Sequence, residues 1–164
     1  NAWATDVLFV GNSYTNNNNL PATVNAVFVA AELESSTDKL TGGGLTLADH
    51  ASRASNPDSD WYTKLVVDAD VREWVVLQDQ SQVPGFPASE AMWIASREGA
   101  QALNDLVSDA GASTMFFLTW GYRSGDPMNE WMYGDFLAMQ ERLTAGYQAY
   151  AAATGMLARP VWRP

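Results

Sequence analysis

The sequence predicts an α/β protein, a three-layer α/β/α sandwich around a parallel five-stranded sheet with the flavodoxin-like strand order 2-1-3-4-5. Short, continuous apolar runs of the kind found in strands buried on both faces occur at VLFVG (7–11), WVVLQ (74–78) and TMFFLTW (114–120). Segments with the apolar spacing of helices separate these runs. Strands that alternate with helices indicate βαβ units and therefore a parallel sheet.

The first helix is expected over residues 20–34, where apolar side chains recur at helical spacing. Pro21 suits the first turn of this helix, since its fixed φ is helical and its missing N–H would be unpaired there. The residues expected to share its buried face are Leu20, Val24, Val27, Phe28 and Ala31. A second strand is expected within residues 35–47, interrupted by the glycine triplet 42–44.

The remaining elements follow the same alternation. Helices are expected over 60–71 (with Trp61, Leu65 and Val66 inward), over 88–110 closed by Gly111, and over 134–154 ended by Gly155. A last strand is expected to begin in the stretch LARPVW (157–162). Neither a repeat nor an interdomain linker is visible, so we expect residues 1–164 to form a single domain.

Composition restricts the function classes. With 19 acidic and 9 basic residues the net charge is -10, and no basic patch is visible, so nucleic acid and anionic membranes are poor partners. No apolar run approaches the roughly 18 residues of a membrane-spanning helix. The absence of cysteine excludes disulfides, thiolate metal sites and a cysteine nucleophile. A single histidine makes a zinc site an unfavoured interpretation, and we expect no metal. A calcium or magnesium ion bound by carboxylates is left open, although no EF-hand spacing is present.

Both ends of the sequence lead to expectations about the whole protein. The chain opens on Asn1-Ala2 and not on Met, which favours a removed upstream segment and a secreted or periplasmic protein, with localisation otherwise open. It ends on ARPVWRP without a capping element, so we expect that a C-terminal segment is lacking. The oligomeric state is left open.

Polar residues follow each expected strand. In an open parallel sheet, ligands bind outside the carboxyl ends of the strands. Those ends carry Gly11-Asn12-Ser13, the glycine triplet 42–44, Gln78-Asp79-Gln80-Ser81, and Thr119-Trp120-Gly121-Tyr122-Arg123. Four such ends together predict the rim of a pocket.

Ser13 is the candidate nucleophile, because a serine at a strand-to-helix junction can expose its hydroxyl in the cleft. Acyl transfer also needs donors for the developing oxyanion. The Ser13 amide, a glycine amide from 42–44, and the side-chain amide of Gln78 or Gln80 are candidates. The alternatives stay open: a helix-capping Ser13, a flexible glycine loop, and a Gln78 that bonds neighbouring backbone.

In these motifs the chain resembles the SGNH (GDSL-type) hydrolases. VLFVGNSYT matches the family's first block, with Asn12 replacing its aspartate, and GGGLTLADH matches the block that supplies an oxyanion glycine, Gly43 or Gly44. VVLQDQSQ departs from the usual Gly-X-Asn-Asp and is closer to the Gln-Gly-Glu motif of the carbohydrate-esterase and sialate O-acetylesterase branches. LTWGYRSGD also resembles a bacterial branch of the superfamily.

The resemblance implies a serine esterase that removes an acyl group, with acetyl on a carbohydrate as the favoured case, and needs no cofactor. It implies a catalytic Ser13 and an oxyanion hole from Ser13, Gly44 or Gly43, and Gln78, with Gln80 in reserve. The residues expected to contact a small-molecule or carbohydrate ester are Asn12, Asp79, Trp120, Tyr122 and His50.

The family's last block, Asp-X-X-His, supplies the base and is absent from this sequence. Either the block lies beyond Pro164, or the protein lacks it and is inactive, so we leave open whether this chain is an enzyme. His50 follows the second strand, which is the wrong place for the family's base. The rival interpretation is an SGNH-like protein that binds a glycan or other ligand without cleaving it. A flavodoxin-like nucleotide or phosphate binder is a third, although a P-loop and a GxGxxG motif are missing.

Overall fold

The computed structural model describes residues 5–69 and 72–155. Their sheet has four parallel strands in the order β2-β1-β3-β4, namely β1 (Thr5–Gly11), β2 (Ser35–Thr41), β3 (Trp74–Leu77) and β4 (Ser113–Phe116). The predicted α/β class and parallel sheet are confirmed, with four strands in place of five. The expected last strand at 157–162 lies outside the described residues.

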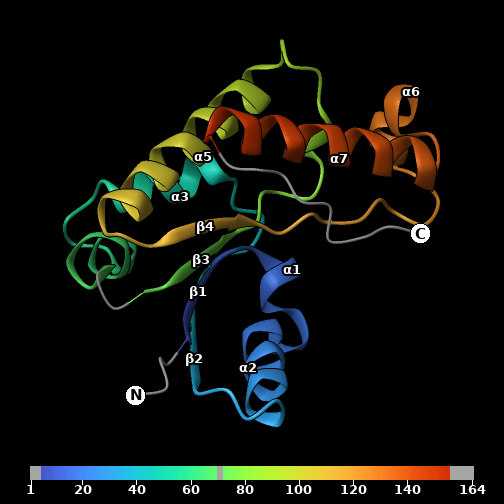
Figure 1. Ribbon diagram of the computed structural model, residues 1–164. Coiled ribbons are helices and arrows are strands. Elements are labelled where there is room, and N and C mark those ends of the chain that lie inside the picture. The colour runs from blue at the N-terminus through green and yellow to red at the C-terminus, as the bar shows by residue number, and fades with distance from the viewer. Residues whose placement is uncertain (1–4, 70–71, 156–164) are drawn as a thin grey trace.

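Helices cover both faces of the sheet, as Figure 1 shows. The short α1 (Ser13–Asn16) and α2 (Leu20–Ala30) lie on one side. On the other side lie α3 (Leu47–Ala54), α5 (Ala91–Asp109) and α7 (Phe136–Ala153). Shorter helical segments are η1 (Asn17–Asn19), α4 (Asp60–Tyr62), η2 (Thr63–Val67), η4 (Val83–Gly85), η5 (Pro127–Asn129) and α6 (Glu130–Tyr133).

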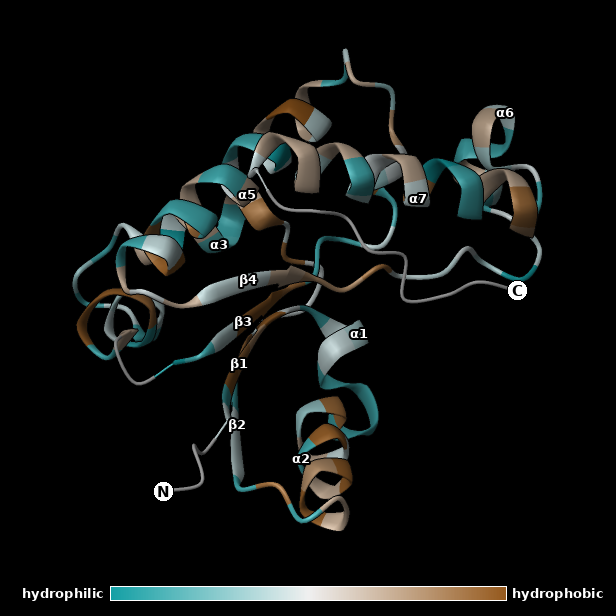
Figure 2. Ribbon diagram, in the orientation of Figure 1, coloured by the Kyte–Doolittle hydropathy of each residue, from teal (hydrophilic) through white to brown (hydrophobic). Residues whose placement is uncertain are grey.

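The main core lies between the sheet and the layer of α3, α5 and α7. Strand residues that point to this side pack against apolar helix residues; they are Leu8, Val10, Leu40, Val75 and Leu77, packed with Leu47, Leu65, Trp93, Leu103, Tyr147 and Tyr150. Figure 2 shows hydrophobic residues concentrated along β1 and β3, in the middle of the sheet. Burial of these runs is the main stabilising contribution that the sequence encodes.

Two glycines allow backbones on this side of the sheet to touch. A Cβ on Gly99 of α5 would lie 2.6 Å from the carbonyl carbon of Leu47, at the start of α3. A Cβ on Gly146 of α7 would lie 1.6 Å from the carbonyl oxygen of Pro84, in the turn after β3. These two contacts fix α3 and α7 against the carboxyl end of the sheet, where polar residues gather.

Helix α3 was not among the predicted elements. It begins with a capping box: the Thr46 hydroxyl accepts from the Asp49 amide at 3.1 Å, and the Asp49 carboxylate accepts from the Thr46 amide at 2.8 Å. The Thr46 amide also holds the pKa of Asp49 below its usual value. The sequence signal for this helix is Thr-Leu-Ala-Asp at 46–49, shortly after the glycine triplet.

Two other helices differ from their predictions. Helix α2 ends at Ala30, and its Val27, expected on the buried face, is 64% exposed. The helix expected over 60–71 is the short α4 followed by the π-helical η2, and Val66, expected inward, is exposed. In both segments the apolar spacing correctly indicated a helical conformation. It did not indicate which face of the helix would pack against the rest of the protein.

Candidate active site

Ser13 lies at the junction that the sequence predicts, directly after β1 and in the first position of α1. Asn12 caps this helix, since its side-chain oxygen accepts from the Tyr14 amide at 3.1 Å. Ser13 itself is exposed, and its hydroxyl forms no hydrogen bond with any described residue. The junction therefore presents a free serine hydroxyl at the carboxyl edge of the sheet.

Gln78 holds the junction from beneath. Its side-chain oxygen accepts from the Asn12 amide at 3.0 Å and from the Thr15 hydroxyl at 2.8 Å, and its amide nitrogen donates to the Asp79 carbonyl. The side chain is completely buried. Gly11 must be glycine here, because a Cβ would lie 2.5 Å from the Gln78 oxygen. Both ends of the Gln78 side-chain amide are therefore bonded to groups inside the protein. In this arrangement the side chain is not an open oxyanion donor beside Ser13.

The glycine triplet lies beside this junction and is bound to it at both ends. The Gly42 amide donates to the Gly11 carbonyl at 3.3 Å, and the Asn12 side-chain amide donates to the Leu45 carbonyl at 3.1 Å. Between these bonds, the Gly43 and Gly44 amides form no hydrogen bond with the described residues. Gly44 has φ +69, and no atom comes within 4 Å of a Cβ built there. The loop thus offers exposed backbone N–H groups next to Ser13.

Asn12 and Asp79, both expected at the substrate, are internal instead. Asn12 is 2% exposed, and Asp79 is completely buried. The Asp79 carboxylate accepts hydrogen bonds from the Leu47 amide (3.0 Å), the Gln80 amide (2.8 Å), the Ser96 hydroxyl (2.8 Å) and the Tyr150 hydroxyl (3.0 Å). Burial raises the pKa of Asp79, and these donors oppose the rise. The carboxylate joins three helices to the end of β3 and is closed to a surface ligand.

His50 is also completely buried, and the expected substrate contact does not fit this position. Its Nδ1 accepts from the Trp61 indole N–H at 2.7 Å, and Nε2 is buried without a hydrogen-bond partner among the described residues. Burial lowers the pKa of His50 to about 4. The histidine is therefore neutral at pH 7 and is not placed to take a proton from Ser13.

The segment after β4 brings Trp120 against Tyr14, and we call these two stacked rings the aromatic shelf. The Trp120 ring stacks on Tyr14, the residue after the candidate nucleophile, with 4.8 Å between centroids and 9° between planes. Trp120 remains 50% exposed. Tyr122 and Ser81 share a hydrogen bond of 2.7 Å between their hydroxyls. Burial, with a further contribution from Tyr122, raises the pKa of Tyr14 to about 12, so this phenol stays protonated.

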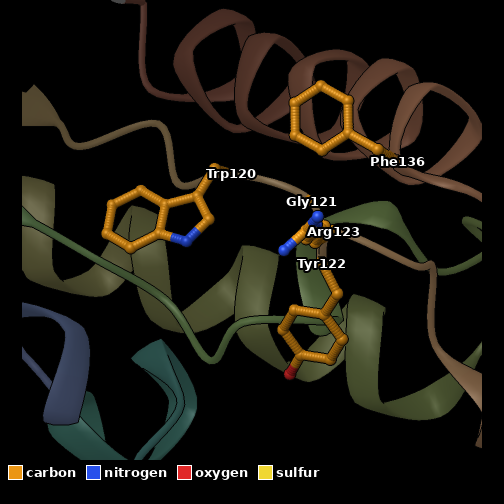
Figure 3. A pocket seen from close by; sticks show the side chains of 5 residues that line it. All are labelled: Trp120, Gly121, Tyr122, Arg123 and Phe136. Atoms are coloured by element: carbon orange, nitrogen blue, oxygen red, sulfur yellow. The ribbon is translucent and has the colours of Figure 1, made fainter.

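The shelf borders an open hollow of about 500 Å³. It is lined by Trp120, Gly121, Tyr122, Arg123 and Phe136 (Figure 3). Phe136, at the start of α7, was not predicted to belong to the site; nothing in its local pattern distinguishes it from a core residue. Trp120 and Tyr122 were expected at the substrate, and the structure places both against this hollow.

Gln80, the reserve oxyanion donor, folds back on its own loop. Its side-chain oxygen accepts from the Gln82 amide at 2.7 Å, and its nitrogen donates to the Gln82 side chain at 3.1 Å. The Tyr133 hydroxyl donates to the Gln82 carbonyl at 2.6 Å and so joins α6 to this loop. Among the candidate donors, the backbone amides of Ser13, Gly43 and Gly44 are thus the open ones in the described part of the chain.

Within residues 5–69 and 72–155 there is no group of three or more acidic or histidine side chains arranged to hold a metal ion. A search of the same residues finds no helix that is long and apolar enough to cross a membrane.

Comparison with solved structures identifies the fold. A candidate SGNH hydrolase from Slackia heliotrinireducens superposes with a TM-score of 0.73 at 22% identity, covering 94% of this chain and 78% of that protein. A DUF4886 family protein from Bacteroides uniformis gives 0.74 at 14% identity, with coverages of 94% and 66%. The esterase EstA from a Pseudoalteromonas species gives 0.58 at 12% identity, with coverages of 92% and 74%.

The chain therefore has the fold of the SGNH hydrolases. It spans about two thirds of the Bacteroides protein's length and about three quarters of the Slackia and Pseudoalteromonas proteins. No protein-family profile matches the sequence, and no curated protein matches it.

Proposed function

We propose that the protein is a serine ester hydrolase of the SGNH type, with Ser13 as its nucleophile. The observation that carries the proposal is the exposed Ser13 hydroxyl, held at the strand-to-helix junction beside the open amides of Gly43 and Gly44. A nucleophile with adjacent backbone donors is the arrangement that acyl transfer requires.

In the proposed reaction, Ser13 Oγ attacks the ester carbonyl carbon while its proton passes to a general base. The amides of Ser13 and Gly44, with Gly43 as the neighbouring donor, stabilise the oxyanion. The alcohol then leaves with a proton, and water releases the acyl group from Ser13. Gln78 acts by holding the junction in place, and no cofactor takes part.

The general base comes from outside the described residues, since His50 is buried and its Nδ1 is occupied by Trp61. The Asp-X-X-His block of the family resemblance would supply it, together with the acid that orients it. In this part of the proposal, the domain requires a segment beyond Pro164 to be active.

An acetyl ester on a carbohydrate is the favoured substrate. The half-exposed face of Trp120 beside Ser13 supports this choice, because sugar rings pack their apolar faces against aromatic side chains. The hollow of about 500 Å³ is within the usual range for a small-molecule site.

A fluorophosphonate probe tests the nucleophile without knowledge of the substrate. In a protein extended beyond Pro164, we expect one covalent adduct by intact mass, located on Ser13 by peptide mapping, and Ser13-dependent turnover of 4-nitrophenyl acetate. Ser13→Ala should abolish the adduct and lower turnover by roughly a thousandfold or more. Ser52→Ala, which changes an exposed serine of α3, is the matched control and should retain both.

A binding protein that does not cleave its ligand is the second candidate. The free Ser13 hydroxyl, which has no base partner within the described residues, favours it. If a protein extended to its natural terminus neither labels at Ser13 nor turns over any ester, the esterase proposal is wrong and the binding function remains.

A further inference from the structure

Arg123 forms no ion pair with any of the described residues, although the protein is acidic. The ion pairs found in the described part of the chain join Lys64 and Arg72 to Asp38, far from this position in the fold. Arg123 is exposed and lines the hollow beside Ser13, although the whole chain carries a net charge of -10. Figure 3 shows Arg123 near the centre of the view, to the right of Trp120 and below Phe136.

Three other polar groups of the hollow are already hydrogen-bonded within the protein. The Gly121 amide donates to the Gln140 side chain at 3.0 Å, and the Tyr122 amide donates to the Met139 sulfur at 3.2 Å. The Tyr122 hydroxyl is bonded to Ser81. Among the described residues that line the hollow, the Arg123 guanidinium and the Trp120 indole N–H form no side-chain hydrogen bond with the described residues, and the guanidinium is the charged group of the two.

Two exposed aromatic rings line the same hollow as this cation. Trp120 is 50% exposed and Phe136 is 41% exposed, and both line it. A flat ring can lie on such aromatic faces while a carboxylate attached to it accepts two parallel hydrogen bonds from a guanidinium.

We propose that this hollow binds a ring that carries a carboxylate, and that Arg123 makes the enzyme prefer esters whose alcohol is such an acidic ring. Trp120 stacks on Tyr14, the residue after Ser13, so a ring lying on Trp120 would be near the nucleophile. In the proposed pose the ester oxygen faces Ser13 and the carboxylate faces Arg123. The preference for the ester rests on the proposed esterase function, whereas binding of the acid does not.

Binding is measured first, by isothermal titration calorimetry on Ser13→Ala, with 4-hydroxybenzoate and its neutral counterpart 4-hydroxybenzamide. We expect the carboxylate to bind roughly tenfold more tightly, since a hydrogen-bonded charge pair is gained. Arg123→Gln should remove the difference between the two ligands. Arg97→Gln, which changes an exposed arginine of α5, is the matched control and should keep it.

Turnover is measured second, as kcat/KM for 4-acetoxybenzoate against its methyl ester, in a protein that has an intact Ser13 and extends beyond Pro164. A roughly tenfold preference for the acid is expected, and it should shrink as salt is raised. A second pair, an O-acetylated uronic acid and the matching O-acetylated neutral sugar, shows whether the ring is aromatic or a sugar.

Equal binding of the acid and the amide, or a preference that survives Arg123→Gln, would overturn the proposal. Arg123-dependent binding without any Ser13-dependent turnover would instead overturn the esterase function and leave the carboxylate site standing.

Discussion

Trp61 donates its indole N–H to Nδ1 of His50 at 2.7 Å, and this bond makes the chain's one histidine an acceptor inside the core. The protonated imidazole would lose that acceptor and would have to carry a charge without solvent. Both effects oppose protonation. The pairing explains why a histidine next to a candidate active site has a structural role.

His50 should therefore titrate far below an ordinary histidine. Its pKa of about 4 can be measured from a single imidazole signal by proton NMR, because the chain has no second histidine. Trp61→Phe removes the donor to Nδ1 and should raise the midpoint toward the ordinary value of 6.5. A midpoint near 6.5 in the unmodified protein would show that His50 is accessible to water.

The same low pKa should make the protein less stable in mild acid. Above pH 6.5 the histidine is neutral in both the folded and the unfolded chain. Between pH 6.5 and about 4 the unfolded chain takes up a proton that the folded chain refuses. The free energy of unfolding should thus fall by about 3 kcal/mol as pH decreases through this window. Urea unfolding at several pH values, compared with His50→Gln, isolates this contribution from that of the carboxylates.

Truncating Gln78 should damage the fold more than truncating Gln80. Gln78→Ala leaves the Asn12 amide and the Thr15 hydroxyl buried without their shared acceptor, so we expect a loss of about 2–4 kcal/mol. Gln80→Ala, in a half-buried loop, should cost less than about 1.5 kcal/mol. Urea denaturation compares the two, and equal losses would contradict the central role of Gln78.

Asp79→Asn should destabilise the protein although the change in shape is small. An amide group turns one acceptor into a donor, which faces the hydroxyl and amide donors that now bond the carboxylate. We expect a loss of about 2–4 kcal/mol in thermal or urea unfolding. The control Asp105→Asn changes an exposed carboxylate of α5 and should leave the free energy of unfolding nearly unchanged. A neutral Asp79→Asn would mean that the buried carboxyl is already protonated in the native state.

Gly146→Ala should separate α7 from the turn after β3. The new methyl group would lie 1.6 Å from the Pro84 carbonyl oxygen, a backbone atom that cannot move alone. We expect a loss of about 3 kcal/mol or more, comparable to severe overpacking. Gln148→Ala, an exposed position of the same helix, should change the stability by less than about 0.5 kcal/mol. Near-equal stabilities would show that α7 does not rest on this turn.

The sequence predicted the framework of the site well, because that framework depends on local patterns. The apolar run before Gly11 and the polar residues after it are sufficient to place Ser13 at a strand end, and the structure agrees. The Ser13 and Gly44 assignments themselves stay predictions. The capping box of α3 was equally readable, at Thr46 and Asp49, and was missed.

What the sequence could not supply is the direction in which each polar side chain points. Asn12, Gln78 and Asp79 all follow strands, yet their side chains turn inward. The Gln78 side-chain oxygen accepts from the Asn12 amide, and the Asn12 side-chain amide donates to the Asp79 carbonyl. Such orientation depends on partners more than 60 residues away in the chain, as the Asn12–Gln78 bond shows. The place of Phe136 in the hollow could not be predicted for the same reason, because the tertiary fold brings the start of α7 to the segment after β4.

The division between buried and exposed groups at the end of β1 has a consequence for how this domain can evolve. We expect stability to depend on Asn12, Gln78 and Asp79, which are buried, and to depend little on Ser13 and Arg123, which are exposed. Substitutions that change reactivity or ligand choice are therefore nearly free of folding cost. One inherited scaffold can acquire, exchange or abandon a chemistry without first being rebuilt.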